Sequence, residues 1–482
     1  ALMMQKKFIT NLAILISLNL LIKPFWILVI EPNVQYQVGN EAYGEYFALL
    51  NFSFLLNILL DFGITNFNNK NIAQNNHLLE KHFSGLFLLK LLLGIVYIVV
   101  TISIGMMVGY STRYLKLLFL LGFNQFLISM ILYLRSNLLG LHAFKADSII
   151  SILDRFIMIA ICALLMWTAF TGIYIDIMNF VYAQSIAYLI TAILAFIVVL
   201  RKTEKFTLSW NRPFWIMILK KSFPFAVLVL LMTFYNRLDA VMIEKLLPEG
   251  EGAVQTGIYA KGFRLLDAAN MIAYLFSLQL LPVFSRMLKY KENVENIVKL
   301  SFTLLITPAI IAAAVCWFYQ VEIISLINHG VTDSATIFSM LMTCFIAIST
   351  TYIFGTLLTA NGNLKQLNTM ALIGICLNFI LNIILIPHYK AMGAAYSSLV
   401  TQFFTASIQI YLTYKIFKFK VNYRLIITVI IFALGVTAAG FLSRMFISNY
   451  FLGIAVMCSI SGLWALLTGL ISFKSIMRFM KY

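Results

Sequence analysis

Charged side chains are scarce in this sequence. Only 11% of the 482 residues are charged and 62% are hydrophobic. A soluble globular protein carries about 25% charged residues. Apolar segments of about 20 residues recur from end to end, and a helix of that length crosses the hydrocarbon core of a bilayer. Backbone amides in lipid must be hydrogen-bonded within their own segment, so each span must be helical. The composition excludes a water-soluble domain and predicts an all-α polytopic membrane protein.

Patterns for catalysis and metal binding are also lacking. The five cysteines lie singly in apolar segments, and the five histidines show no H-E-x-x-H spacing for zinc. The sequence has no P-loop motif for nucleotide phosphates. We therefore expect neither an enzyme nor a protein with a cofactor or metal. The first apolar segment is too long for the core of a signal peptide, so no cleavage is expected.

Loop signals between the apolar segments predict about fourteen transmembrane helices. They cover residues 8–30, 42–64, 83–108, 115–140, 148–170, 176–200, 222–244, 255–285, 297–319, 334–359, 366–387, 391–414, 425–445 and 450–473.

The positive charge is unevenly distributed along this map. The formal net charge is +17, and most of the 35 lysines and arginines fall on one side when the N-terminus is placed inside. The outer segments hold only Arg113, Lys116, Lys245, Lys390 and Arg444. Short cytoplasmic loops are enriched in these residues. We therefore predict a multi-pass membrane protein with both termini in the cytoplasm, and no nucleic-acid partner.

A polar, basic segment at residues 201–221 predicts a cytoplasmic linker between two helical bundles. The N-terminal six-helix bundle would then cover 1–200 and the C-terminal six-helix bundle 222–418. Two additional helices and a tail would occupy 419–482.

Internal similarity favours the same division. Gly44 and Tyr46 recur with the same spacing as Gly257 and Tyr259, in the second helix of each predicted bundle. Two bundles in parallel orientation, related by an axis along the membrane normal, would produce such a pseudo-repeat. The alternative is a chance match between apolar helices.

Seven basic residues fall inside the predicted spans when helix-end residues (Lys116, Arg135 and Arg444) are counted with the adjoining loops, and depth separates the seven. Lys90, Arg155 and Lys299 lie near cytoplasmic helix ends, where long side chains are expected to extend to the interface. The other four lie deeper: Lys23, Arg237, Lys261 and Arg264. A charge at the bilayer centre costs about 2.5 to 3.5 kcal/mol on insertion scales, so such residues usually face a cavity.

The four deeper cations predict an anion-binding cavity, because only Asp239 and Asp267 accompany them inside these helices, with Glu244 at a helix end. The alternative is a set of interhelical ion pairs that hold the bundles together. Asp61 and Asp239 are candidates for coupling to an ion. For Asp61 we favour an interfacial capping role beside Asn66, Asn68 and Asn69.

Four short segments carry a family resemblance. They are residues 44–47 (Gly-Glu-Tyr-Phe), 60–63 (Leu-Asp-Phe-Gly), 235–239 (Tyr-Asn-Arg-Leu-Asp) and 257–265 (Gly-Ile-Tyr-Ala-Lys-Gly-Phe-Arg-Leu). With the helix count, they resemble the polysaccharide (O-antigen, Wzx-like) flippases of the multidrug/oligosaccharidyl-lipid/polysaccharide exporter superfamily. Asn71-Ile72-Ala73 departs from the basic residue often found near that point, so that loop is given no role.

This resemblance implies a flippase that moves a polyprenyl-pyrophosphate-linked oligosaccharide from the inner to the outer leaflet by alternating access. Its expected partners are that lipid-linked glycan, membrane lipid and glycan-assembly proteins, and the chain is expected to be a monomer. The main alternative is a cation-coupled multidrug or metabolite antiporter of the same superfamily. A membrane glycan polymerase or ligase is a more distant alternative.

Overall fold

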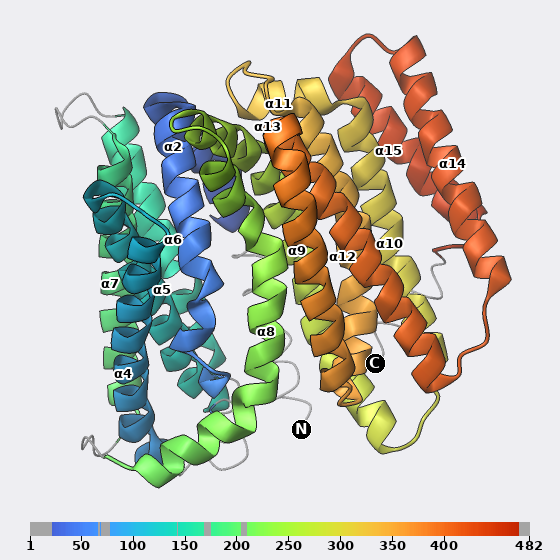
Figure 1. Ribbon diagram of the computed structural model, residues 1–482. Helices are drawn as coiled ribbons and strands as arrows, with labels where there is room; N and C mark the ends of the chain where they lie inside the picture. Colours follow the sequence, from blue (N-terminus) through green and yellow to red (C-terminus); the bar gives the residue numbers. More distant parts are fainter. Residues whose placement is uncertain are drawn as a thin grey trace. The chain divides into compact units, whose positions relative to one another are not determined.

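The computed structural model describes residues 22–65, 68, 78–141, 143–167, 175–203 and 210–471. Within these ranges the chain forms helices and no strand (Figure 1). Ten helices among the described residues are long and apolar enough to cross a membrane. The prediction of an all-α polytopic membrane protein is confirmed.

The chain divides into two compact units, Ala1–Val241 and Met242–Tyr482. Each unit is described by itself below, and the predicted boundaries at 200, 221 and 418 stay a prediction.

Unit 1 is built around a long central helix. Its elements are η1 (Trp26–Ile30), α2 (Glu31–Leu55), η2 (Asn57–Leu60), α4 (Leu78–Met107), α5 (Thr112–Gly140), α6 (Phe144–Trp167), α7 (Ile177–Leu200) and most of α8 (Arg212–Leu246). The central helix α5 packs against α2, α4, α6 and α7. Gly39 (φ 85°) interrupts the helical run of α2 and so separates the first two predicted spans. The part of the first span before residue 22 lies outside the described residues.

Unit 2 is organised around α12. Its elements are α9 (Glu251–Lys289), α10 (Glu295–Phe318), α11 (Gln320–Ile327), α12 (Ala335–Ala360), α13 (Leu364–Phe417), α14 (Tyr423–Phe446) and α15 (Tyr450–Leu467). Helix α12 packs against α9, α10 and α13. Helices α14 and α15, shown in red in Figure 1, pack against each other and against α10.

Helix α13 contains two predicted spans joined at a sharp break. Lys390 has non-helical angles (φ 55°, ψ −134°), three residues after Pro387. A Cβ at Gly393 would lie only 2.4 Å from the Leu385 carbonyl oxygen, so the missing side chain permits this tight turn. Divided at Gly39 and Lys390, the described helices supply a counterpart for each predicted span.

Two features of the helix map were not predicted. The short helix α11 is one: its Glu322 pairs with Arg444 of α14. The other is the start of α8 at Arg212, inside the predicted linker. Trp215 explains this extension, because its indole N–H donates to the Gly85 carbonyl at 3.0 Å and its side chain is buried.

Candidate functional site

Helix α2 ends at Leu55, inside the second predicted span and before Asp61. The chain passes through the 3₁₀ turn η2 and then through Phe62 (φ 45°) and Gly63 (φ 80°). The amide of Ile64 donates to the carbonyl of Asp61 at 2.8 Å, one position later than in an α-helix. The Leu60 carbonyl is thereby released from the α-helical hydrogen-bond pattern. A buried carbonyl at this depth needs another donor.

Lys90 of α4 supplies that donor. Its Nζ donates to the Leu60 carbonyl at 2.8 Å, to Ser129 Oγ of α5 at 2.6 Å and to Asp61 Oδ1 at 2.7 Å. The Lys90 side chain is only 1% exposed. The prediction that Lys90 extends to the interface is therefore wrong, because the side chain points inward to η2 and α5.

Asp61 has contacts other than those of the predicted asparagine cap. It accepts hydrogen bonds from the Thr65 hydroxyl and from the Thr65 amide, and it pairs with Lys90. Asn68 instead donates to Ser136 and Asn137 of α5. Asn66 and Asn69 lie outside the described residues. The Asp61 side chain is 29% exposed.

Lys23 lies in a group of charged and aromatic residues of unit 1. It is half-buried, and the charged groups that act on it are Arg155, Asp154 and Arg135. The guanidinium carbon of Arg155 lies 5.6 Å from the ring centroid of Trp26 and 5.9 Å from that of Tyr188. From the sequence, the Arg155 side chain was expected to extend to the membrane interface, because Arg155 lies near a helix end. Its contacts with the two aromatic rings, which stabilise a cation, were not foreseen.

Arg237 and Asp239 lie in the C-terminal part of α8. Arg237 is half-buried, and its guanidinium carbon lies 5.0 Å from the Phe54 ring centroid of α2. Asp239 is 1% exposed. Residues two apart on a helix do not share a face, so the two side chains have different surroundings.

Lys261 and Arg264 lie one turn apart on α9 and are 5% and 4% exposed. Lys261 donates to both carboxylate oxygens of Asp333, at 2.9 and 3.0 Å. Gly262 permits this contact: a Cβ there would lie 3.0 Å from the Phe338 amide nitrogen, so α9 and α12 approach closely. Asp333 was not predicted, because it lies in a loop 72 residues away and outside any span.

The structure thus describes the predicted site residues in two places. Lys23, Asp61, Arg237 and Asp239 belong to unit 1, and Lys261 and Arg264 to unit 2. Lys261 forms an ion pair with a loop residue of the same unit, which is not an interhelical pair between the two bundles of the kind that the alternative expects. The assembly of all four deeper cations into one anion site stays a prediction.

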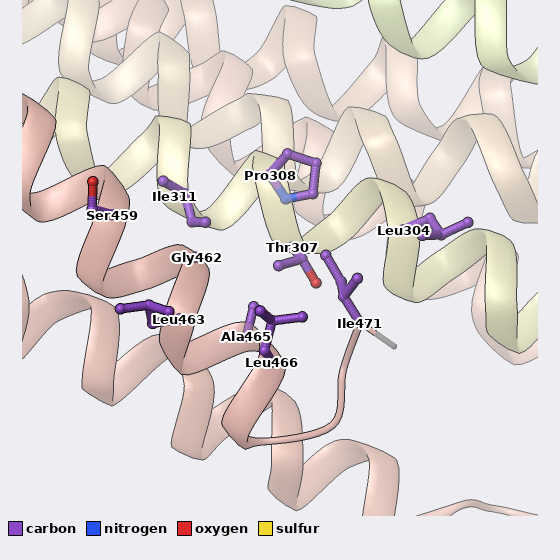
Figure 2. A pocket seen from close by; sticks show the side chains of 10 residues that line it. All are labelled: Leu304, Thr307, Pro308, Ile311, Ser459, Gly462, Leu463, Ala465, Leu466 and Ile471. Atoms are coloured by element: carbon purple, nitrogen blue, oxygen red, sulfur yellow. The ribbon is translucent and has the colours of Figure 1, made fainter. Parts of the chain in front are cut away.

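An apolar groove runs between α10 and α15 of unit 2, with a volume of about 630 Å³. Figure 2 shows the lining residues Leu304, Thr307, Pro308 and Ile311 on α10, with Leu463 and Leu466 on the neighbouring α15. Pro308 has no amide hydrogen, so the Leu304 carbonyl loses its helical partner. The described residues of the lining include no charged side chain. This groove can hold hydrocarbon and is not a candidate for binding an anion.

These observations define a class: a multi-pass α-helical membrane protein with broken helices and with ion pairs buried among its spans, as in transporters. Comparison with protein families then identifies the particular group. The family described as "Polysaccharide biosynthesis protein" matches residues 8–288, more than half of the chain. The chain belongs to this family, and the resemblance stated from the sequence is confirmed.

Solved structures of low identity share the fold. A lipid II flippase MurJ in an inward closed conformation has a TM-score of 0.70 at 14% identity, over 99% of this chain and 100% of that chain. An inward-facing multidrug resistance MATE family transporter of the MOP superfamily has a TM-score of 0.61 at 13% identity, over 84% and 96%. The Vibrio cholerae MATE transporter VcmN in a bent form has a TM-score of 0.53 at 13% identity, over 86% and 96%. A comparison of the sequence with curated proteins finds no match.

Proposed function

We propose that this protein is a flippase for a polyprenyl-pyrophosphate-linked oligosaccharide, which it moves from the inner to the outer leaflet of the bacterial cytoplasmic membrane. Membership of the polysaccharide biosynthesis family supports a glycan substrate. The fold shared with the MurJ lipid II flippase supports a lipid-linked one. Transport of this kind needs no covalent chemistry, so the protein is not proposed to be an enzyme.

One observation favours this function over a cation-coupled antiporter: Asp61 is already engaged by the buried ammonium of Lys90. An antiporter needs an acidic group that can bind and release the coupled cation. By contrast, the basic residues Lys23 and Arg237 are half-buried inside their spans. Half-buried cations are suited to meeting an anionic group such as a pyrophosphate.

In the proposed mechanism, Lys23, Arg237, Lys261 and Arg264 hold the pyrophosphate. Arginine binds two phosphate oxygens through its planar fork, and lysine supplies a compact charge. Lys261 would have to exchange Asp333 for phosphate, so it is the member that changes partner during transport. The polyprenyl tail stays in the bilayer while the two halves alternate between inward-open and outward-open states.

The charge distribution supports the proposed orientation in the membrane. Both termini face the cytoplasm, and the protein acts as a monomer with membrane lipid around it. Glycan-assembly proteins supply its substrate on the cytoplasmic side and use the product outside.

The test is a transport assay in liposomes that contain the purified protein and a fluorescent polyprenyl-pyrophosphate oligosaccharide. We expect protein-dependent access of the glycan to a lectin or a membrane-impermeant quencher on the opposite side. An antiporter would instead exchange a cationic compound for protons or sodium in the same liposomes. Elongation of the glycan would indicate a polymerase. Either result in place of flipping would overturn the proposal.

A further inference from the structure

The Lys90 ammonium lies in a nest of oxygen atoms in unit 1. The nest consists of a carboxylate oxygen of Asp61, the hydroxyl oxygen of Ser129 and the carbonyl oxygen of Leu60, all 2.6 to 2.8 Å from Nζ. These atoms come from the turn after η2, from α5 and from the end of η2 itself. A single buried nitrogen therefore joins three elements of the unit.

The chemistry of this nest is that of a cation site. Carbonyl oxygens at unwound helix ends, together with carboxylate and hydroxyl oxygens, are the groups that bind sodium ions in membrane transporters. The C-terminal end of a helix also carries a partial negative charge, and Leu60 is the last residue of η2. The Leu60 carbonyl is available because Ile64 donates to Asp61 instead. The Leu60 carbonyl, the Asp61 carboxylate and the Ser129 hydroxyl thus all favour a positive charge at this point.

We propose that the nest formed by Leu60, Asp61 and Ser129 is a monovalent-cation site whose resident cation is the tethered ammonium of Lys90. The protein carries this cation covalently. It binds no free sodium at the nest, and its transport cycle takes no driving force from sodium there. The inference concerns unit 1 alone and holds whichever substrate the protein moves.

Removal of the ammonium should convert the nest into a site for a free ion. Asp61 would then be left as an unbalanced carboxylate beside the Leu60 carbonyl, and its 29% exposed side chain gives an ion a route of entry. Methionine is the suitable replacement for Lys90, because it keeps the length of the side chain without the charge. The nest would retain its oxygen atoms and attract sodium.

The experiment measures thermal unfolding of the purified full chain in lipid nanodiscs. Sodium chloride is compared with N-methylglucamine chloride at constant ionic strength. We expect the melting temperature of Lys90→Met to rise with sodium concentration and to saturate. We expect the wild-type protein to melt at the same temperature in both salts. A Lys90→Met protein that is indifferent to sodium would overturn the proposal.

Two further variants identify the source of any sodium response. The double variant Lys90→Met, Asp61→Asn should lose the response, because the nest then has no carboxylate. Lys261→Met is the matched control: Lys261 and Asp333 have exposures of 5% and 31%, close to the 1% and 29% of Lys90 and Asp61. Among the described residues, Lys261 donates to the two oxygens of one carboxylate. A similar sodium response in Lys261→Met would mean that removal of the lysine from any such ion pair suffices.

The wild-type protein provides a separate test that does not depend on the folding of Lys90→Met. If sodium stabilises the wild-type protein, and Asp61→Asn removes that effect, then free sodium binds at Asp61 despite the lysine. The proposal would then be wrong. Absence of a wild-type response, with flipping unchanged when sodium is replaced by N-methylglucamine, is the expected outcome.

Discussion

Lys261 of α9 and Asp333 form an ion pair with unequal burial: the lysine side chain is 5% exposed and the aspartate 31%. The ammonium nitrogen lies 2.9 and 3.0 Å from the two carboxylate oxygens. Loss of one partner therefore has different consequences on the two sides. The partly exposed aspartate can still be hydrated after loss of the lysine, whereas a lysine ammonium that has lost Asp333 stays buried.

The first prediction is that Asp333→Ala destabilises the protein more than Lys261→Met does. Breaking a buried ion pair by removal of one partner costs about 3 to 5 kcal/mol, and we expect Asp333→Ala to approach the lower end. Lys261→Met should cost about 1 kcal/mol, because methionine fills the space and Asp333 can be hydrated. Thermal unfolding in nanodiscs measures both. Equal losses would contradict this asymmetry.

The second prediction concerns the close approach of α9 and α12 at Gly262. A Cβ there would meet the Phe338 amide nitrogen at 3.0 Å and its Cα at 3.1 Å, and both atoms belong to the backbone. Gly262→Ala should therefore force the helices apart and cost about 1 to 3 kcal/mol. Gly462→Ala in the α10–α15 groove is the control, because its Cβ would meet nothing within 4 Å. If both changes lower the unfolding temperature equally, the loss cannot be attributed to the close approach of α9 and α12 at Gly262.

The sequence assigned a depth to each charge but could not give the direction of its side chain. Lys90 and Lys299 were both assigned to the interface from their distance to a helix end. In the structure Lys299 is exposed and Lys90 is buried against η2. The break after η2 caused this difference, because it released the Leu60 carbonyl at a depth where only an inward donor can reach it.

Helix breaks and ion-pair partners differed in how well the sequence predicted them. The break near Lys390 falls between the predicted spans 366–387 and 391–414. Asp333 was missed, because its partner is 72 residues away and no spacing rule connects them. The helix α11 was also missed, since its eight residues are too few to form a span. Local rules therefore located the spans, and tertiary contacts determined the pairs.

The third prediction tests the orientation in the membrane. A cysteine at Glu249, which is exposed in the loop between α8 and α9, should react with an impermeant maleimide in intact cells. A cysteine at the exposed Lys202 should react only after permeabilisation. The native cysteines must first be replaced, because Cys376 and Cys458 are exposed. The opposite labelling pattern would reverse the assigned sides and the leaflet from which the substrate enters.

The last prediction is that neutralising Lys23 and Arg237 together abolishes flipping without unfolding the protein. Both side chains are half-buried inside their spans, where a charge is costly unless it serves a ligand or a partner. The double variant Lys23→Gln, Arg237→Gln should keep the wild-type melting temperature within a few degrees and lose substrate flipping in liposomes. Arg237→Lys should remain partly defective, because a lysine cannot hold two phosphate oxygens in a fixed fork.

The matched control for this prediction is Lys299→Gln. This change also removes one positive charge, but at an exposed position of α10. It should flip the substrate at the wild-type rate. Lys90→Gln would be a poor control, since Lys90 binds three oxygen atoms of unit 1 and its loss affects stability. If the double variant is stable and flips normally, the pyrophosphate is not held by Lys23 and Arg237. The assignment of a flippase could still hold, with the anion bound elsewhere in the protein.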